Sequence, residues 1–414
     1  MNLHRLAPTL ALVALLAGCG GDSAPPPDGD AATRVQVPQW PVLFSHAWSR
    51  TADTAFQGDQ KQAGAEFDPY GVKRDLESLG LVVYQPDKLA YASHERRGQL
   101  LYKKCAGRTM TDILCQGADP QPVDGVHLAT LDYCADPSRW KRHGFSDETQ
   151  CRAGLKFNLI CHSQGCPDSR YMMAAVRNEF SGELMYRHIA SWTSMAGANK
   201  GTAQADWVLE RLAACLTPGC RSLLLDAFFA VDSFSKNQAL ITEGGESVVA
   251  LSRKYMLVTT DMDCRPAAGR ECPPSFNQRY PLPEDPAHPV YYQSFSSQIH
   301  DIAHPCYAGN RLFWQVVLER EGPNDGNISV ESQQFTSYGP EGSGGATPVI
   351  ARWIDGQTRD PSRPHPGLNH MAYNDSEVPG IPGVSCRGED NSAFHFSRLE
   401  LYRGIVSELA AMGY

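Results

Sequence analysis

The sequence changes abruptly from mainly apolar to polar residues at His162. A mainly apolar run from Leu155 to Ile160 leads into His162-Ser163-Gln164-Gly165, and a helix-like segment from Asp168 to Phe180 follows. This order predicts a buried strand, a tight turn and a helix, with Ser163 at the apex of the turn. This stretch therefore constrains how the rest of the chain can fold.

A serine at the apex of such a turn is a candidate nucleophile, because the turn holds its hydroxyl clear of the sheet edge. The turn requires small side chains two residues before and two residues after the serine, and Cys161 and Gly165 occupy these positions. A serine that merely caps the following helix is the alternative interpretation. The strand before it and the helix after it favour the nucleophile.

The N-terminal residues predict export. His4 and Arg5 precede a short apolar core, Leu10 to Leu16, and a small-residue site that ends at Cys19. The apolar core is too short to cross a bilayer, and the segment resembles a bacterial lipoprotein signal, in which the cysteine is lipidated. Residues 1–19 are therefore predicted to be a signal peptide, with Cys19 as a lipid anchor in the cell envelope.

Residues 20–38 are rich in Gly, Pro, Asp and Ala, so they are expected to form a flexible tether rather than a packed unit. Gly20 and Gly21 provide no acidic residue after the cysteine, which favours the outer membrane over the inner one. Residues 39–414 are long enough for one large domain with insertions, or for one domain and a lid. The formal net charge of -9, without a basic block, argues against a nucleic-acid partner.

The chain has thirteen cysteines, and twelve remain when Cys19 is set aside. An even number in an exported chain predicts up to six disulfides, and the absence of Cys-x-x-Cys pairs argues against zinc. Close spacing in the sequence favours four local pairs: Cys105 with Cys115, Cys134 with Cys151, Cys215 with Cys220, and Cys264 with Cys272. Cys161 and Cys166 could form a disulfide or remain buried thiols, while Cys306 and Cys386 could tie down the C-terminal segment.

Strand and helix patterns alternate along the folded part, which predicts a parallel sheet with crossover helices. Strands are expected within residues 40–48, 81–84, 189–194, 255–259 and 290–295, and helices at 71–79 and 397–412. Residues 97–152 carry four cysteines and are predicted to be a disulfide-stapled insertion. Residues 205–250 have helical spacing and could form part of the core or a lid over the site.

Three further sites carry candidate functional groups. His300 and His304 are four residues apart, but Pro305 follows and no third ligand is evident, so polar histidines are favoured over a metal site. Asp325 lies in an Asn-Asp-Gly turn and could be a turn residue or the carboxylate that orients a catalytic histidine. The candidates for that base are His365, His370 and His395, and His370 lies in a loop ahead of the last helix.

The candidate groups occur in the order serine, aspartate, histidine, and the chain thereby resembles the secreted bacterial true lipases. Five stretches carry this likeness: Phe44 to Trp48 at an oxyanion-type strand end, His162 to Gly165 at the elbow, Ala196 to Thr202 in a Gly-rich loop, Asn324 to Gly326 with Ser329 and Ser332 at the acid turn, and Asn369-His370. The resemblance implies an α/β-hydrolase fold with a Ser163-Asp325-His370 triad. It also implies that the backbone N–H groups of Trp48 and Gln164 bind the oxyanion.

The activity implied is hydrolysis of acyl-ester lipids at the cell surface, and no cofactor is expected. A polyester depolymerase, an acyltransferase and a non-catalytic binding lipoprotein are the alternatives. The chain departs from the family pattern at Ala47, at Cys161 and Cys166, and at Asn199. The family also holds a structural calcium, but the position of its aspartate ligand is Ala372 here, so no metal is assigned.

Overall fold

A computed structural model describes residues 35–48, 71–107, 114–115, 121–214, 240–265, 271–304, 307, 310–355, 357–358, 366–373, 394–395 and 398–414. Within these ranges six strands form one sheet in the order β2-β1-β5-β6-β7-β8, and every neighbouring pair is parallel. The strands are β1 (Val42–Ser45), β2 (Val83–Tyr84), β5 (Phe157–His162), β6 (Ile189–Met195), β7 (Tyr291–Ser296) and β8 (Ile350–Trp353). The alternating pattern in the sequence therefore predicted the parallel sheet correctly.

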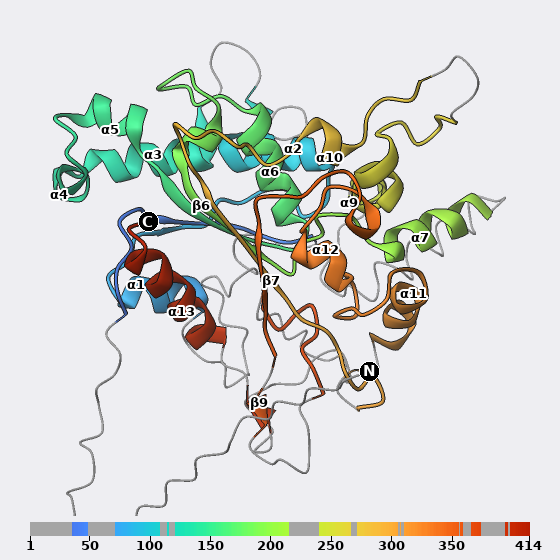
Figure 1. Cartoon of the computed structure of the whole chain (residues 1–414). Coiled ribbons are helices and arrows are strands. Elements are labelled where there is room, and N and C mark those ends of the chain that lie inside the picture. The colour runs from blue at the N-terminus through green and yellow to red at the C-terminus, as the bar shows by residue number, and fades with distance from the viewer. Residues whose placement is uncertain are drawn as a thin grey trace, which may run out of the picture. The chain divides into compact units, whose positions relative to one another are not determined.

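Helices cover both faces of this sheet (Figure 1). On one face Val42 and Phe44 of β1 pack with residues of α1 (Val72–Ser78) and α13 (Arg398–Ala411). On the other face Leu43 and Leu159 belong to a second core with α2 (His94–Tyr102), α3 (Val126–Ala135) and α6 (Gly165–Ala175). Because successive strand residues point to opposite faces, the fully buried and mainly apolar strands β1 and β5 supply both cores at once.

A mostly parallel sheet with helices on both faces, whose central strand β5 ends in the turn that carries Ser163, is the α/β-hydrolase fold. The helix after the turn begins at Gly165 and ends at Ala175, earlier than predicted, because Val176 adopts an extended backbone. No helix in the described part of the chain combines the length and the apolar character that crossing a membrane requires.

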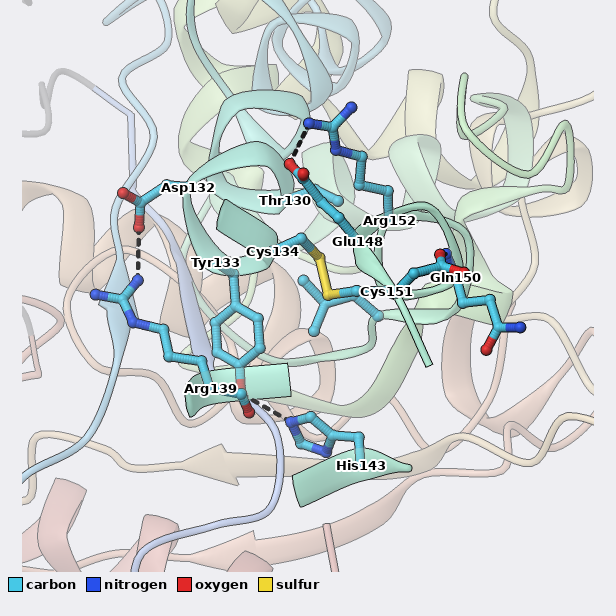
Figure 2. The surroundings of a disulfide bond; sticks show 12 residues. Thr130, Asp132, Tyr133, Cys134, Arg139, His143, Glu148, Gln150, Cys151 and Arg152 are labelled. Atoms are coloured by element: carbon cyan, nitrogen blue, oxygen red, sulfur yellow. Dashed lines mark hydrogen bonds and ion pairs between the residues drawn. A yellow bond between two sulfur atoms is a disulfide. The ribbon is translucent and has the colours of Figure 1, made fainter. Parts of the chain in front are cut away.

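The insertion at 97–152 contains two disulfides that the spacing predicted, Cys105–Cys115 and Cys134–Cys151. Its described elements are the end of α2, β3 (Lys104–Cys105), β4 (Pro122–Asp124), α3, α4 (Pro137–Trp140), η2 (Lys141–His143) and α5 (Glu148–Gly154). Figure 2 shows the Cys134–Cys151 bond joining α3 to α5. An ion pair between Arg139 and Asp132, 2.9 Å long, flanks it.

The predicted helical region contains α7 (Ala203–Ala214) and α9 (Leu240–Leu251), while residues 215–239, with Cys215 and Cys220, lie outside the described ranges. Val208 and Val248 from these two helices share a small apolar core. The prediction of a strand at 255–259 is wrong. That stretch is a π-type turn, η4 (Lys254–Val258), which continues the helical backbone bonding after α9 and buries Tyr255 and Met256 against Phe276.

Most of the remaining elements lie in the C-terminal half. The disulfide Cys264–Cys272 agrees with the pairing predicted from the sequence, whereas Cys306 and Cys386 lie outside the described residues. The apolar segment that precedes the acid turn is a helix, α11. The other described elements are η3 (Met185–His188), α10 (Phe276–Arg279), α11 (Arg311–Glu321), α12 (Val330–Gln334), η6 (Pro340–Gly342), β9 (Gln357–Thr358) and β10 (Phe394–His395).

Candidate active site

Ser163 stands at a strained turn between β5 and α6. Its backbone φ is 54°, a left-handed conformation that a residue with a Cβ adopts only where its surroundings impose it. The Ser163 N–H donates to the carbonyl of Met195 at 3.2 Å, and the Ser163 carbonyl accepts from the N–H of Ala198 at 3.2 Å and from that of Cys166 at 3.1 Å. The end of β6 and the start of α6 therefore hold the turn.

A disulfide joins Cys161 to Cys166 across this turn. Of the two alternatives that the sequence left open, the structure contains the bond rather than two thiols. Both cysteines are fully buried, Cys161 within β5 and Cys166 in the first turn of α6. The residues before and after Ser163 are therefore linked covalently as well as by backbone hydrogen bonds.

Asp325 is fully buried in the turn that follows α11. One carboxylate oxygen, Oδ1, accepts from the backbone N–H groups of Asn327 at 3.0 Å and Ile328 at 2.8 Å. The other, Oδ2, lies 2.7 Å from His370 Nδ1. The turn residues thus satisfy one oxygen of the carboxylate and leave the other to face the imidazole.

His370 connects the acid turn to the elbow, since its Nε2 lies 2.8 Å from Ser163 Oγ. The backbone of His370 is held as well: its N–H donates to the Asp325 carbonyl at 2.9 Å, and His162 Nε2 donates to its carbonyl at 3.0 Å. The rings of His162 and His370 lie 4.8 Å apart, tilted by 32°. The structure therefore brings Ser163, His370 and Asp325 into one hydrogen-bonded chain.

The other histidines singled out from the sequence are not placed in this chain. His365 and the side chain of His395 lie outside the described residues. His300 and His304 lie in a turn region, where His300 Nε2 is 3.2 Å from Asp355 Oδ2. Within the described part, no group of three or more His, Cys, Asp or Glu side chains is arranged to hold a metal ion.

The two predicted oxyanion donors follow neighbouring strands. Because β1 and β5 are parallel, with Ser45 opposite Cys161, the residues after β1 run beside the elbow. Trp48 is half-buried, and its ring contacts Tyr91 edge-on at 5.0 Å. Gln164 is fully buried, and its side chain is held at both ends of the amide: it donates to the Ala92 carbonyl at 3.0 Å and accepts from Ser247 Oγ at 3.1 Å.

The structure contains a buried cluster of charged side chains next to the end of β1, which was not predicted from the sequence. Asp168 Oδ2 accepts from Lys88 Nζ at 2.8 Å and from Arg97 Nε at 2.6 Å, and Asp168 Oδ1 lies 3.1 Å from His94 Nδ1. Burial alone would raise the pKa of Asp168, but Arg97 and Lys88 outweigh it and hold that pKa well below its ordinary value. Burial lowers the pKa of Lys88 to about 7, against the attraction of Asp168.

The lysine in the loop from Ala196 to Thr202 has a structural role. Lys200 Nζ is buried and donates to Glu331 Oε1 at 2.7 Å, to Ser337 Oγ at 2.8 Å and to the Gly339 carbonyl at 2.6 Å. Asn199, one of the departures from the lipase pattern, donates to Ser194 Oγ at 3.0 Å. The ammonium group ties the loop to α12 and the segment after it, and it has no donor left for a ligand.

Two positions concern the predicted lipid anchor and the calcium that the resemblance to lipases brings into question. Cys19, the signal peptide and residues 20–34 of the tether lie outside the described residues. Ala372, at the position of the family's calcium ligand, has no side-chain oxygen, and its N–H donates to Asn369 Oδ1 at 3.1 Å. No metal is therefore assigned to the segment after His370.

No protein-family model matches the chain, and no curated protein matches its sequence. Among solved structures, a metagenomic carboxyl esterase is 14% identical, with a TM-score of 0.46, over 96% of this chain and 82% of the esterase. The lipase of Staphylococcus hyicus is 14% identical, with a TM-score of 0.46, over 94% and 98%. Lipase 1 of Pelosinus fermentans is 13% identical, with a TM-score of 0.43, over 90% and 99%. At these values the likenesses establish neither family nor activity.

Proposed function

We propose that this protein is a serine carboxylic ester hydrolase. The observation that carries the proposal is the continuous hydrogen-bonded chain from Ser163 Oγ through His370 to Asp325, with contacts of 2.8 and 2.7 Å. Nucleophile, base and orienting acid within hydrogen-bond reach of one another are the geometry of serine acyl transfer. The strained elbow supports the same proposal, because it presents the serine hydroxyl at the end of a central strand.

In the first half-reaction Ser163 Oγ attacks the carbonyl carbon of an ester while His370 Nε2 accepts the hydroxyl proton. The tetrahedral intermediate collapses, the bond between the carbonyl carbon and the alkoxy oxygen breaks, and His370 gives its proton to the departing alcohol. In the second half-reaction His370 removes a proton from water, which attacks the acyl-enzyme. Ser163 recovers its proton as the carboxylic acid leaves.

Asp325 has two roles in this mechanism. Its Oδ2 accepts from Nδ1–H, so Nε2 is the nitrogen left to accept the serine proton, and its negative charge stabilises the imidazolium that forms. The N–H groups of Asn327 and Ile328 fix the carboxylate in place. The contact from His162 to the His370 carbonyl holds the main chain that carries the imidazole.

The oxyanion of the tetrahedral intermediate would be bound by the backbone N–H groups of Gln164 and Trp48. Gln164 directly follows the nucleophile, and the first N–H groups of a helix have no intrahelical acceptor. Trp48 belongs to the loop that continues β1 beside the elbow. Both donors belong to the main chain, so replacing the Trp48 side chain should harm turnover less than replacing Ser163.

We assign acyl-ester lipids as the substrate class, with the protein held at the cell envelope through Cys19. The assignment joins the lipoprotein-like signal to the lipase-like motif order of the sequence. An anchored enzyme would meet its substrate at a membrane surface.

The test is hydrolysis of p-nitrophenyl esters of increasing acyl length by the exported, disulfide-intact protein. Ser163→Ala should abolish turnover, whereas Ser343→Ala, at an exposed serine, should leave it unchanged. A profile that favours long chains would support lipid substrates over short esters. Folded wild-type protein without activity, or Ser163→Ala protein with full activity, would refute the proposed hydrolase.

A further inference from the structure

We propose that Arg97, Lys88 and Asp168 position the loop that binds the oxyanion, which makes them positioning residues for ester hydrolysis. The inference rests on the proposed function and adds a part of the site that the motifs do not contain. All three side chains are almost completely buried, and none of them belongs to the Ser163-His370-Asp325 chain. Their contacts converge on residues 45–47, where β1 ends and the loop begins.

Two carbonyl groups of the loop accept hydrogen bonds from Lys88 and Arg97. The His46 carbonyl accepts from Lys88 Nζ at 3.0 Å and from Arg97 Nη2 at 2.9 Å. The Ala47 carbonyl accepts from Arg97 Nη2 at 2.9 Å. Arg97 also donates through Nη1 to the carbonyls of Leu89 and Ala90, which anchors the guanidinium to the chain on its other side.

The His46 side chain adds a donor to the same loop. Burial, with Lys88 and Arg97 nearby, lowers the pKa of His46 well below its ordinary value, so the ring is neutral. Its Nε2 accepts from the Lys88 backbone N–H at 3.1 Å, which leaves the ring proton on Nδ1. Nδ1 lies 3.1 Å from the Ala47 carbonyl and therefore donates to it.

These contacts determine which way the loop N–H groups point. In a trans peptide the C=O of one residue and the N–H of the next point in opposite directions, and the described chain contains no cis peptide. The His46 carbonyl shares its peptide unit with the Ala47 N–H, and the Ala47 carbonyl shares its unit with the Trp48 N–H. With both carbonyls bound to the cluster, the N–H groups of Ala47 and Trp48 face away from it.

Asp168 ties this loop to the elbow. It lies in the first turn of α6, five residues after Ser163, and it pairs with both cations. Ser45 Oγ makes a second link, because it accepts from Lys88 Nζ at 2.9 Å and donates to the Gly165 carbonyl at 2.8 Å. One buried cluster thus connects the loop after β1 to the helix that carries Gln164, the two sources of the proposed oxyanion donors.

Buried ion clusters are costly to desolvate and often add little stability over apolar side chains of the same volume. A planar guanidinium can hold two carbonyls in a fixed direction, which a lysine in its place cannot reproduce. We therefore infer that the cluster serves to orient the loop. A misplacement of about 1 Å at such a loop costs on the order of 100-fold in turnover.

The experiment compares Arg97→Lys with Arg170→Lys in the full, disulfide-intact protein. Arg170 is an equally buried guanidinium on α6, but its hydrogen bonds go to Asn277, Tyr280 and Asn199 and not to the loop after β1. Arg97→Lys should lower kcat about 100-fold without a matching change in KM. The Ki of an alkyl trifluoromethyl ketone, whose serine adduct carries the oxyanion, should rise by the same factor. Arg170→Lys should change neither.

Lys88→Met is the second variant and keeps the test decisive if Arg97→Lys does not fold. It removes one donor from the His46 carbonyl and should lower kcat and weaken the ketone together. Wild-type values of kcat and Ki in folded Lys88→Met and Arg97→Lys proteins would overturn this inference alone. Wild-type protein without Ser163-dependent turnover would overturn the proposed hydrolase and this inference with it.

Discussion

Gly165→Ala tests how closely the elbow helix must approach the loop after β1. A Cβ at residue 165 would lie 2.2 Å from the Ser45 carbonyl oxygen and 2.7 Å from that of His46, and real Cβ contacts essentially never fall below 3.0 Å. The obstructing atoms are backbone atoms, so no side chain can rotate out of the way. The two segments must therefore separate by at least 0.8 Å at Ser45.

This separation should reduce both turnover and stability. A displacement of about 1 Å between nucleophile and oxyanion donors costs roughly 100-fold in kcat. Overpacking of this kind also costs about 1–3 kcal/mol of unfolding free energy. Both quantities are accessible, kcat from hydrolysis of p-nitrophenyl butyrate and the unfolding free energy from urea denaturation followed by circular dichroism.

Gly404→Ala is the matched control, because a Cβ at this exposed position in α13 meets nothing within 4 Å. It should leave kcat unchanged and raise the unfolding free energy by about 0.5–1 kcal/mol, as alanine favours the helix. A Gly165→Ala protein with the stability and kcat of the wild type would refute the close packing of elbow and loop.

Asp325→Asn should lower kcat by about 10⁴-fold with KM little changed, because an amide stabilises the wrong imidazole tautomer; steady-state kinetics will show this. Replacing Cys134 and Cys151 together with Ala should lower the unfolding free energy by about 3 kcal/mol in urea titrations, with kcat unchanged, because the bond closes a loop of 17 residues. Burial, with Glu321 nearby, raises the pKa of Asp206 to about 6, so the folded state binds its proton more tightly than the unfolded state and stability falls as pH rises from about 4 to 6. Asp206→Asn should remove that part of the pH dependence, and equal slopes in both proteins would contradict it.

Local patterns predicted much of the fold and of the site. The parallel sheet could be read because buried strands are apolar runs and crossover helices have a 3.6-residue period. The pairs Cys105–Cys115, Cys134–Cys151 and Cys264–Cys272 could be predicted because short loops close readily. The candidate triad could be assembled because its three residues lie in local motifs whose order in the chain is informative.

Other features could not be read from the sequence for physical reasons. Asp168 lies 80 residues after Lys88 and 71 residues after Arg97 in the sequence. Isolated charged residues are ordinarily expected on the surface, so no local signal marks these three as buried partners. The run at 254–258 is apolar and short, which suits a strand or a buried helical turn, and its packing against Phe276 decides between them. The Cys161–Cys166 bond depends on the elbow geometry itself, which sequence spacing does not specify.

The most direct test of the central claim is covalent labelling by an alkyl fluorophosphonate, followed by mass spectrometry of the peptides. If Ser163 is a nucleophile activated by His370, its Oγ will bond to phosphorus as fluoride leaves. One label per chain is expected, on the peptide that contains Ser163, with none in Ser163→Ala and much slower labelling in His370→Ala. Folded, disulfide-intact protein that stays unlabelled, or that labels equally in Ser163→Ala, would contradict the account.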